Sequence, residues 1–450
     1  MKSWLATIRC AARSRQPLSR SHTEATAAPV TSDDFLLQLE RYLTARRLGS
    51  TALAQYDRGP VGKAFLAPIA DALARLSNDF TRARQALTEA ASGDYWRDAR
   101  RLAYLFHFLP RNYVKAAWVL AETGRHARLA QELAAKSRFA ILDIGCGPGT
   151  ASLATLNFLA ALRPTAFGVS VALVEASPTA AQEAAELLRQ AVAWLNAERR
   201  EAITIHIAPQ VGDAAQAQSY LPSDGADFIW LSNVLNETLL ESPAASVAAP
   251  DWVTTLAREG LAPDGGLYVI EPALRETARA AMKLRDALLA SDSTLQVFAP
   301  CTADGPCRLL AQRPARDWCH VSLTWQPPPL VAQLDSLTGL RSQAQKFFYF
   351  VLRRDGKRAA EPRQGWSAWR VIGDLQREKG REKRLACGPD RCALLTRFKR
   401  DRRPENAPFS KAERGDILWL SESPAPLADE LRLSPGARVE RQSPIERLME

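Results

Sequence analysis

The sequence lacks an uninterrupted apolar run long enough to cross a bilayer. Its longest weakly charged stretch, residues 151–174, is broken by Arg163 and Pro164, whereas a membrane-spanning helix needs about 20 consecutive apolar residues. We therefore expect no transmembrane helix and no membrane partner. The stretch is instead predicted to form a helix, a turn and a strand.

Cysteine is scarce, and its pattern does not suit a secreted disulfide framework. The seven cysteines are odd in number, and five of them lie after residue 300, whereas small secreted domains usually carry even sets at regular spacing. We expect an intracellular reducing compartment, either the bacterial cytoplasm or the mitochondrial matrix. Residues 1–31 hold five Lys or Arg against one acid, which is typical of a mitochondrial targeting segment or of a flexible basic N-terminus.

Positive charge is concentrated near the C-terminus. The net charge is +10, and residues 341–420 hold 21 Lys and Arg against 10 Asp and Glu. Such a basic C-terminal block could steer the protein onto a phosphate backbone, although a solvated basic surface would have the same composition. Aromatic and basic residues of the block are the candidates for stacking on bases or contacting phosphates: Trp366, Trp369, Phe398, Arg397, Lys399 and Arg400.

The apolar pattern predicts an α/β fold with additions at both ends. Residues 32–136 have helical periodicity. Residues 137–355 alternate short apolar runs with helical segments, which is typical of a doubly wound parallel sheet of the Rossmann-like kind. Residues 356–450 are predicted to form a basic, β-rich C-terminal extension. The five strands expected in the sheet are residues 140–144, 169–174, 203–207, 228–232 and 267–271.

A glycine-rich turn follows the first predicted strand, in Ile141-Leu-Asp-Ile-Gly-Cys-Gly-Pro-Gly-Thr150. Gly145, Gly147 and Gly149 let the backbone approach a ligand closely, because no Cβ stands in the way. Asp143 precedes them, and the spacing Asp-x-Gly-x-Gly-x-Gly is similar to motif I of class I S-adenosylmethionine (SAM) methyltransferases. We predict SAM as the cofactor, with a nicotinamide pocket as the alternative.

Two further acids resemble cofactor-contacting residues of that family. Glu175 ends the second strand, where the family's acid accepts hydrogen bonds from ribose hydroxyls, and Asp213 follows the third strand, as in the adenine-contacting element. After the fourth strand, Asn233, Asn236 and Glu237 are the catalytic candidates. The Asn/Asp-Pro-Pro-aromatic motif of amino-group methylation is missing there, so a helix-capping role is the alternative for these three.

Late cysteines form a candidate metal site. Five residues separate Cys301 from Cys307, and eleven separate Cys307 from Cys319, all within the predicted methyltransferase-like domain; Cys387 follows in the C-terminal extension. Four thiolates could hold zinc or an iron–sulfur cluster. Cys392 is an alternative fourth ligand. Buried structural cysteines would explain the same spacing.

In this order the features resemble the methyltransferase-like small-ribosomal-subunit assembly factors of bacteria and mitochondria. The resemblance rests on five segments: Phe108–Tyr113, Asp143–Thr150, Pro300–Cys307, Trp318–Ser322 and Lys346–Arg354. It implies a [4Fe-4S] cluster held by the cysteines at 301, 307, 319 and 387, and action on the small subunit through its rRNA. A catalytically active SAM-dependent rRNA methyltransferase is the alternative function. The gap before the third cysteine is longer than in eukaryotic members of that family.

Overall fold

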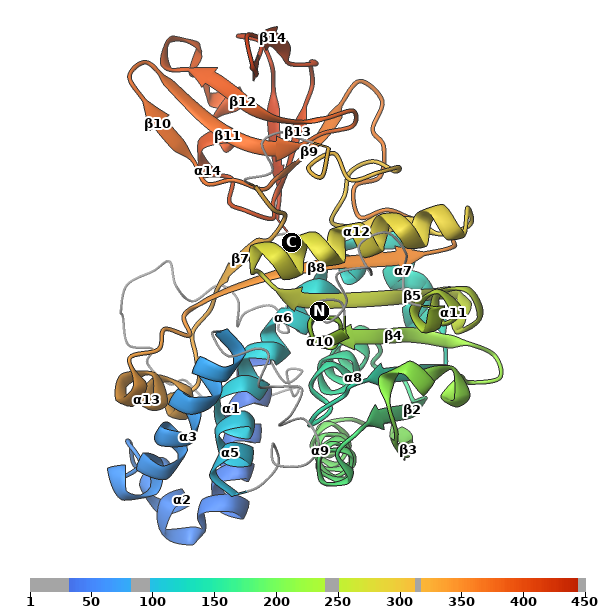
Figure 1. The fold of residues 1–450 in the computed structure, drawn as a ribbon, viewed down its shortest axis with the longest axis vertical. Helices are drawn as coiled ribbons and strands as arrows, with labels where there is room; N and C mark the ends of the chain where they lie inside the picture. The colour runs from blue at the N-terminus through green and yellow to red at the C-terminus, as the bar shows by residue number, and fades with distance from the viewer. Residues whose placement is uncertain (1–31, 82–97, 239–250, 312–316, 444–450) are drawn as a thin grey trace.

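A computed structural model describes residues 32–81, 98–238, 251–311 and 317–443. The basic segment 1–31, expected to be flexible or a targeting signal, lies outside the described residues. Figure 1 shows a large lobe built from helices and a sheet, and a smaller β lobe beyond a long helix at the waist. In the described part of the chain, no helix combines the length and apolarity needed to cross a bilayer.

Helices make up the N-terminal part of the described chain, as the periodicity predicts. The buried side chains Phe35, Leu36 and Leu39 share one face of the first helix, which is how an amphipathic helix joins a core. The helices are α1 (Ser32–Leu43), α2 (Ser50–Tyr56), α3 (Lys63–Thr81), α5 (Asp98–Ala103), α6 (Leu109–Arg125) and α7 (Ala127–Ala135), with π-helical turns at Thr44–Leu48 and Tyr104–Phe108.

A mixed sheet of order β3-β2-β1-β4-β5-β8-β6 forms the centre of the large lobe. Strands β1 to β5 are parallel, whereas β8 is antiparallel to β5, β6 and β7. This topology confirms the predicted doubly wound class I methyltransferase fold. The strands are β1 (Arg138–Ile144), β2 (Phe167–Glu175), β3 (Ile203–Val211), β4 (Ala226–Ser232), β5 (Leu261–Pro272), β6 (Gln296–Ala299), β7 (Val321–Thr324) and β8 (Ala344–Arg353).

Helices cover both faces of this sheet because alternate residues of each strand point to opposite sides. Phe139 and Ile141 of β1 pack in one core with α6, α8 and α9, while Leu142 and Ile144 pack in a second core with α11 and α12. The helices that follow β1 to β5 are α8 (Thr150–Leu162), α9 (Pro178–Ala197), α10 (Leu235–Thr238), α11 (Asp251–Glu259) and α12 (Arg275–Ser291); α13 (Pro329–Thr338) packs against α3 instead.

The smaller lobe holds a second sheet, of order β14-β15-β12-β11-β9-β13-β16, with β10 paired to β11. The predicted β-rich character of the C-terminal region is confirmed. Its elements are β9 (Ser367–Val371), β10 (Gln376–Glu378), β11 (Arg381–Cys387), β12 (Cys392–Phe398), α14 (Pro408–Lys411), β13 (Ile417–Leu420), β14 (Ala425–Leu427), β15 (Glu430–Arg432) and β16 (Val439–Gln442).

A buried ionic network joins the two lobes. Arg370 of β9 donates to Glu122 of α6 at 2.8 Å, and the hydroxyl of Tyr349 in β8 donates to the same carboxylate at 3.1 Å. Arg125, one turn along α6, also pairs with Glu122. Because each member needs the others to remain buried and charged, the network fixes how the lobes dock.

Two of the residues predicted to contact nucleic acid belong to the interior instead. Arg397 is 2% exposed and bonds to Glu382 at 2.5 Å and to Asn406 at 2.9 Å, and Trp369 is equally buried. Their proposed role in RNA contact is therefore wrong: β12 and β9 are central strands of the second sheet, and their inward residues form its core. Lys399 and Arg400, just beyond β12, are exposed.

Candidate functional site

The glycine loop lies at the carboxyl edge of the parallel strands, between β1 and α8. Gly145, Gly147 and Gly149 have φ angles of 61°, 51° and 73°, in the left-handed region that residues with a Cβ rarely adopt. The space is also tight, since a Cβ on Gly145 would lie 2.5 Å from Val234 Cγ2. Here glycine is required both by the conformation and by the close approach of the segment after β4.

Asp143 braces this loop from inside. Its Oδ2 accepts hydrogen bonds from the amide of Ser152 at 3.1 Å and from the Ser152 hydroxyl at 2.7 Å, which ties the end of β1 to the first turn of α8. Burial raises the pKa of Asp143 to about 7, against the opposing effect of the Ser152 hydrogen bonds. The sequence offers no signal for Ser152, and the structure identifies it as the partner of the motif acid.

Glu175 faces the loop from the end of β2. One carboxylate oxygen accepts from the amide of Gly147 at 2.9 Å, and the other accepts from the amide of Ser177 at 3.0 Å. The end of β3 lies at the same edge of the sheet, because the amide of Gly212 donates to the carbonyl of Glu175 at 3.2 Å. Asp213 follows and caps a 3₁₀ turn by accepting from Ala215 at 2.8 Å. The structure thus brings all six predicted cofactor residues to one edge.

The segment after β4 carries the catalytic candidates. Asn233 has a φ of 59°, a conformation that non-glycine residues adopt mostly at turns and functional sites. The side-chain amide of Asn236 is oriented so that its nitrogen faces two acceptors. It donates to the Glu271 carboxylate at 3.3 Å and to the carbonyl of Asn233 at 2.7 Å. Glu237 lies within α10, but its side chain is outside the described residues. Glu271, at the end of β5, also accepts from the amide of Leu235 at 2.9 Å.

A lysine that the sequence does not single out lies behind these residues. Lys115 of α6 donates to Asn112 at 3.0 Å. Burial and the nearby Arg111 guanidinium lower its pKa to about 7, and the Glu271 carboxylate partly opposes them. Lys115 is half-buried and Glu271 is fully buried, so the two interact electrostatically near the ends of β4 and β5.

Four of the predicted metal ligands come together from three separate segments. Cys301 and Cys307 lie in the loop after β6, Cys319 lies just before β7, and Cys387 ends β11. Burial raises the pKa of Cys319 well above its usual range, and the charges of Cys387, Cys301 and Cys307 add to the effect in that order. The four thiols thus interact electrostatically, although they span 87 positions of the sequence.

Register in the second sheet places the two late cysteines side by side on the same face. Cys387 pairs directly with Cys392 across the β11–β12 hairpin, and the Cys392 thiol hydrogen-bonds to Cys387 and raises its pKa. The charge of Cys387 also raises the pKa of Cys307 and of Cys319. Cys387 therefore adjoins the other three cysteines, with Cys392 as its neighbour in the hairpin.

Two buried arginines surround the cysteine group. Arg285 of α12 donates to the carbonyl of Gly305 at 2.9 Å, inside the loop that joins Cys301 and Cys307. Burial alone would lower the pKa of Arg285, but Cys301 and Asp286 outweigh it and raise the pKa. Arg370 donates to the carbonyl of Pro300 at 2.7 Å. These cations would offset the charge of ionised thiols.

Among the described residues, no group of three or more His, Cys, Asp or Glu side chains is close enough to hold a single metal ion. A zinc ion draws each thiolate to about 2.3 Å from one point. In an iron–sulfur cluster each ligating thiolate is bonded to a different iron, so the cysteines stand farther apart. Within the described residues the predicted metal site is therefore not seen, and the iron–sulfur cluster stays a prediction.

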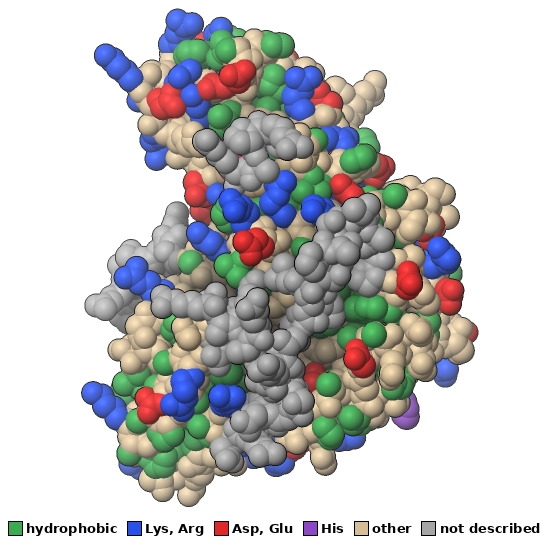
Figure 2. All heavy atoms as spheres, viewed as in Figure 1, with side chains coloured by type: hydrophobic (Ala, Val, Ile, Leu, Met, Phe, Trp, Pro, Cys, Tyr) green, Lys and Arg blue, Asp and Glu red, His purple; other side chains and the backbone are tan. Residues whose placement is uncertain are grey.

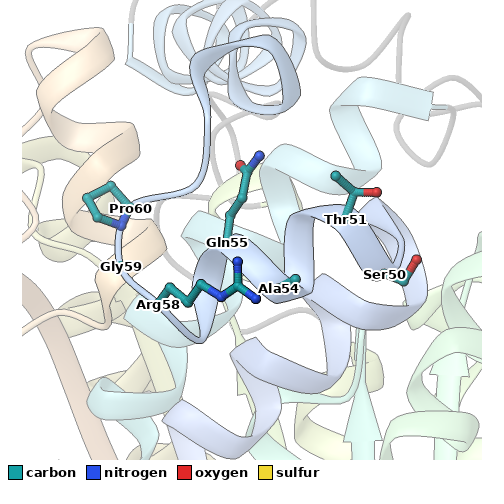
Figure 3. Close-up of a pocket in the computed structure, with 7 residues that line it drawn as sticks. All are labelled: Ser50, Thr51, Ala54, Gln55, Arg58, Gly59 and Pro60. Carbon is teal, nitrogen blue, oxygen red and sulfur yellow. The ribbon is translucent and has the colours of Figure 1, made fainter.

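A surface hollow occurs elsewhere, on α2 and the turn that follows it. Figure 3 shows its lining, in which Arg58 is the charged residue beside Gln55 and Thr51. None of its lining residues is among the predicted site residues. The hollow is therefore separate from the glycine loop and from the cysteine group.

Solved structures with a similar arrangement are mostly methyltransferases of low sequence identity. A candidate class I SAM-dependent methyltransferase from Listeria monocytogenes is 13% identical, with a TM-score of 0.30, covering 71% of this chain and 86% of its own. A candidate RNA methyltransferase from Pyrococcus horikoshii is 13% identical, with a TM-score of 0.27, covering 54% and 82%. A candidate sarcosine dimethylglycine methyltransferase from Galdieria sulphuraria is 17% identical, with a TM-score of 0.27, covering 53% and 87%.

The sequence itself matches one family model over most of its folded part. No curated protein matches the chain. The family model, described as mitochondrial small ribosomal subunit Rsm22, matches residues 98–401, a span that includes the glycine loop, the fourth-strand segment and all four cysteines. The chain therefore belongs to the Rsm22 family.

Proposed function

We propose that the protein is a methyltransferase-like factor of the small ribosomal subunit, which binds SAM at the glycine loop and contacts small-subunit rRNA. The family match over residues 98–401 carries the proposal, since it joins the loop to a ribosomal context. The description of the family as mitochondrial supports a location in the mitochondrial matrix. The bacterial cytoplasm is the alternative location that the cysteine pattern predicts.

SAM would be held by the loop and by Glu175. The methionine part of the cofactor would lie against the glycine loop, and each oxygen of Glu175 has a second lone pair free for a ribose hydroxyl. Asp213 would contact the adenine side of the site, and Asp143 would act by holding the loop in shape.

An iron–sulfur cluster is the second part of the proposal. Cys301, Cys307, Cys319 and Cys387 would be its ligands, and the packing of all four against the same core supports this assignment. A bound cluster would supply a rigid cross-link between the two lobes. The chain's own residues would gather the thiols and, through Arg285 and Arg370, offset their charge.

Catalysis of methyl transfer is the alternative, and the left-handed Asn233, joined to Glu271 through Asn236, favours it. Purified protein, isotope-labelled SAM and small-subunit RNA distinguish the two functions. SAM and RNA binding with no labelled RNA supports the assembly factor. Labelled RNA that disappears with Asn236→Ala supports the enzyme, and failure to bind either SAM or RNA refutes both.

A further inference from the structure

Helix α12, at the waist of the molecule, carries a basic stripe along its outer side. The stripe consists of Arg275, Arg279 and Lys283, each four residues apart, so the three lie on one helix face about 6 Å apart along the axis. Arg275 and Lys283 are exposed and Arg279 is partly exposed, while the opposite side of the helix is buried. Figure 2 shows basic side chains gathered across this waist, between the two lobes.

The stripe differs from the basic C-terminal block in that its cations form no ion pairs with carboxylates among the described residues. Many cations of the block are paired with carboxylates: Arg363, Arg370, Arg381, Lys383, Arg397, Arg402 and Arg414. In the part of the chain that the structure describes, no ion pair involves Arg275, Arg279 or Lys283. Arg279 donates to the backbone carbonyl of Asp317 at 3.0 Å. Glu276 and Asp286 are the acidic residues of the same helix, and Asp317 adjoins Arg279.

The stripe also begins beside the candidate cofactor site. Strand β5 ends at Pro272, and α12 starts three residues later, so Arg275 lies near the carboxyl edge that holds Asn233 and the glycine loop. Pro272 pairs with Phe347 of β8, which places the exposed Lys346 at the same corner. A strand of RNA lying along α12 would therefore end at the edge where SAM is proposed to bind.

We propose that the outer face of α12 binds the phosphate backbone of RNA and holds the strand beside the cofactor edge. This inference rests on the proposed function and adds to it the surface that would carry the RNA. Guanidinium and ammonium groups at regular steps suit successive phosphates, and arginine contacts a phosphate through two parallel hydrogen bonds. Most of the C-terminal block would then contribute to the stability of the small lobe.

The test compares two triple variants that remove the same charge. The first is Arg275→Gln, Arg279→Gln and Lys283→Gln; the control is Arg58→Gln, Lys63→Gln and Arg75→Gln, three exposed residues of the helical region. Binding of a labelled small-subunit rRNA fragment is measured over a range of salt concentrations. The α12 variant should bind at least about tenfold more weakly at low salt, and its log–log salt slope should fall by about 2 to 3.

The possible outcomes separate this inference from the proposed function. If the α12 variant keeps the wild-type slope, or loses no more than the control, the α12 surface is wrong although RNA binding stands. If the wild-type protein binds vesicles of anionic phospholipid and no RNA, both are overturned. S-adenosylhomocysteine binding, measured on each variant, confirms that the large lobe is folded, so a loss of RNA binding alone reports on the stripe.

Discussion

Glu175 bonds to Gly147 across the candidate cofactor site, with 2.9 Å between the carboxylate Oε2 and the amide nitrogen. The bond links the end of β2 to the turn after β1 and so sets the width of the loop. Because the acid that would bind a ribose also positions the loop, a change at Glu175 should affect ligand affinity more than stability.

Glu175→Gln should weaken the binding of S-adenosylhomocysteine by about tenfold or more, since a hydrogen bond to a charged acceptor contributes roughly 1.5 to 3 kcal/mol. Glutamine keeps a neutral acceptor for the amide of Gly147, so the fold should survive. Isothermal titration calorimetry measures the change. Glu259→Gln, at an exposed position, is the control, and equal affinities in both variants would argue against ribose recognition by Glu175.

Gly145→Ala should lower the free energy of unfolding more than Gly339→Ala does. Both glycines have a left-handed φ, 61° and 74°, so alanine at either position adds roughly 1 to 2 kcal/mol of strain. At Gly339 the added Cβ meets nothing within 4 Å, whereas at Gly145 it lies 2.5 Å from Val234 Cγ2. Chemical denaturation should show the larger loss for Gly145→Ala, together with loss of ligand binding. Similar losses in both variants would mean that crowding at the loop has no effect.

Local sequence predicts the glycine loop because Asp143 and the three glycines lie within ten consecutive residues. The parallel strands follow from continuous apolar runs in the same way. Arg397 could not be assigned from the sequence, since it is buried only when β11 and β12 pair and bring Glu382 opposite it. Lys115 and Glu271 lie more than 150 residues apart in the sequence, and only the packing of α6 against the sheet makes them neighbours.

Cys387→Ser and Cys392→Ser should have different effects on bound iron. Cys387 interacts with three other thiols of the group, while Cys392 is its partner in the hairpin. Anaerobically purified Cys387→Ser should lose most of its iron and its broad absorption near roughly 400 nm, whereas Cys392→Ser should keep both. Equal iron loss in the two variants would contradict the ligand assignment, and stoichiometric zinc in the wild type would exclude the cluster.

Lys115→Met should remove a pH dependence of stability. The pKa of Lys115 is lowered from 10.5 to about 7 in the fold, by burial and by Arg111, with Glu271 opposing. Between these two values the unfolded chain binds the proton and the folded protein does not, so this group makes stability rise with pH from about 7 to 10.5. The unfolding free energy of the wild type, relative to Lys115→Met, should therefore increase across that window. A constant difference would show that Lys115 titrates normally.

Removal of Glu122 should destabilise the contact between the lobes more than removal of either of its arginine partners. The carboxylate is shared by Arg125, Arg370 and Tyr349, so Glu122→Ala leaves two buried guanidinium groups without a counter-charge. Breaking a buried pair in this way costs about 3 to 5 kcal/mol. Arg370→Met leaves the Arg125–Glu122 pair intact and should cost less.

The combination Glu122→Leu with Arg125→Met and Arg370→Met tests whether charge is the cause. Apolar replacements of similar size often restore or exceed the stability of a buried ionic network, so the triple variant should be more stable in urea than Glu122→Ala. Should it unfold as easily as the single variant, shape rather than charge would hold the lobes together, and the network would have no separate role in docking β9 against α6.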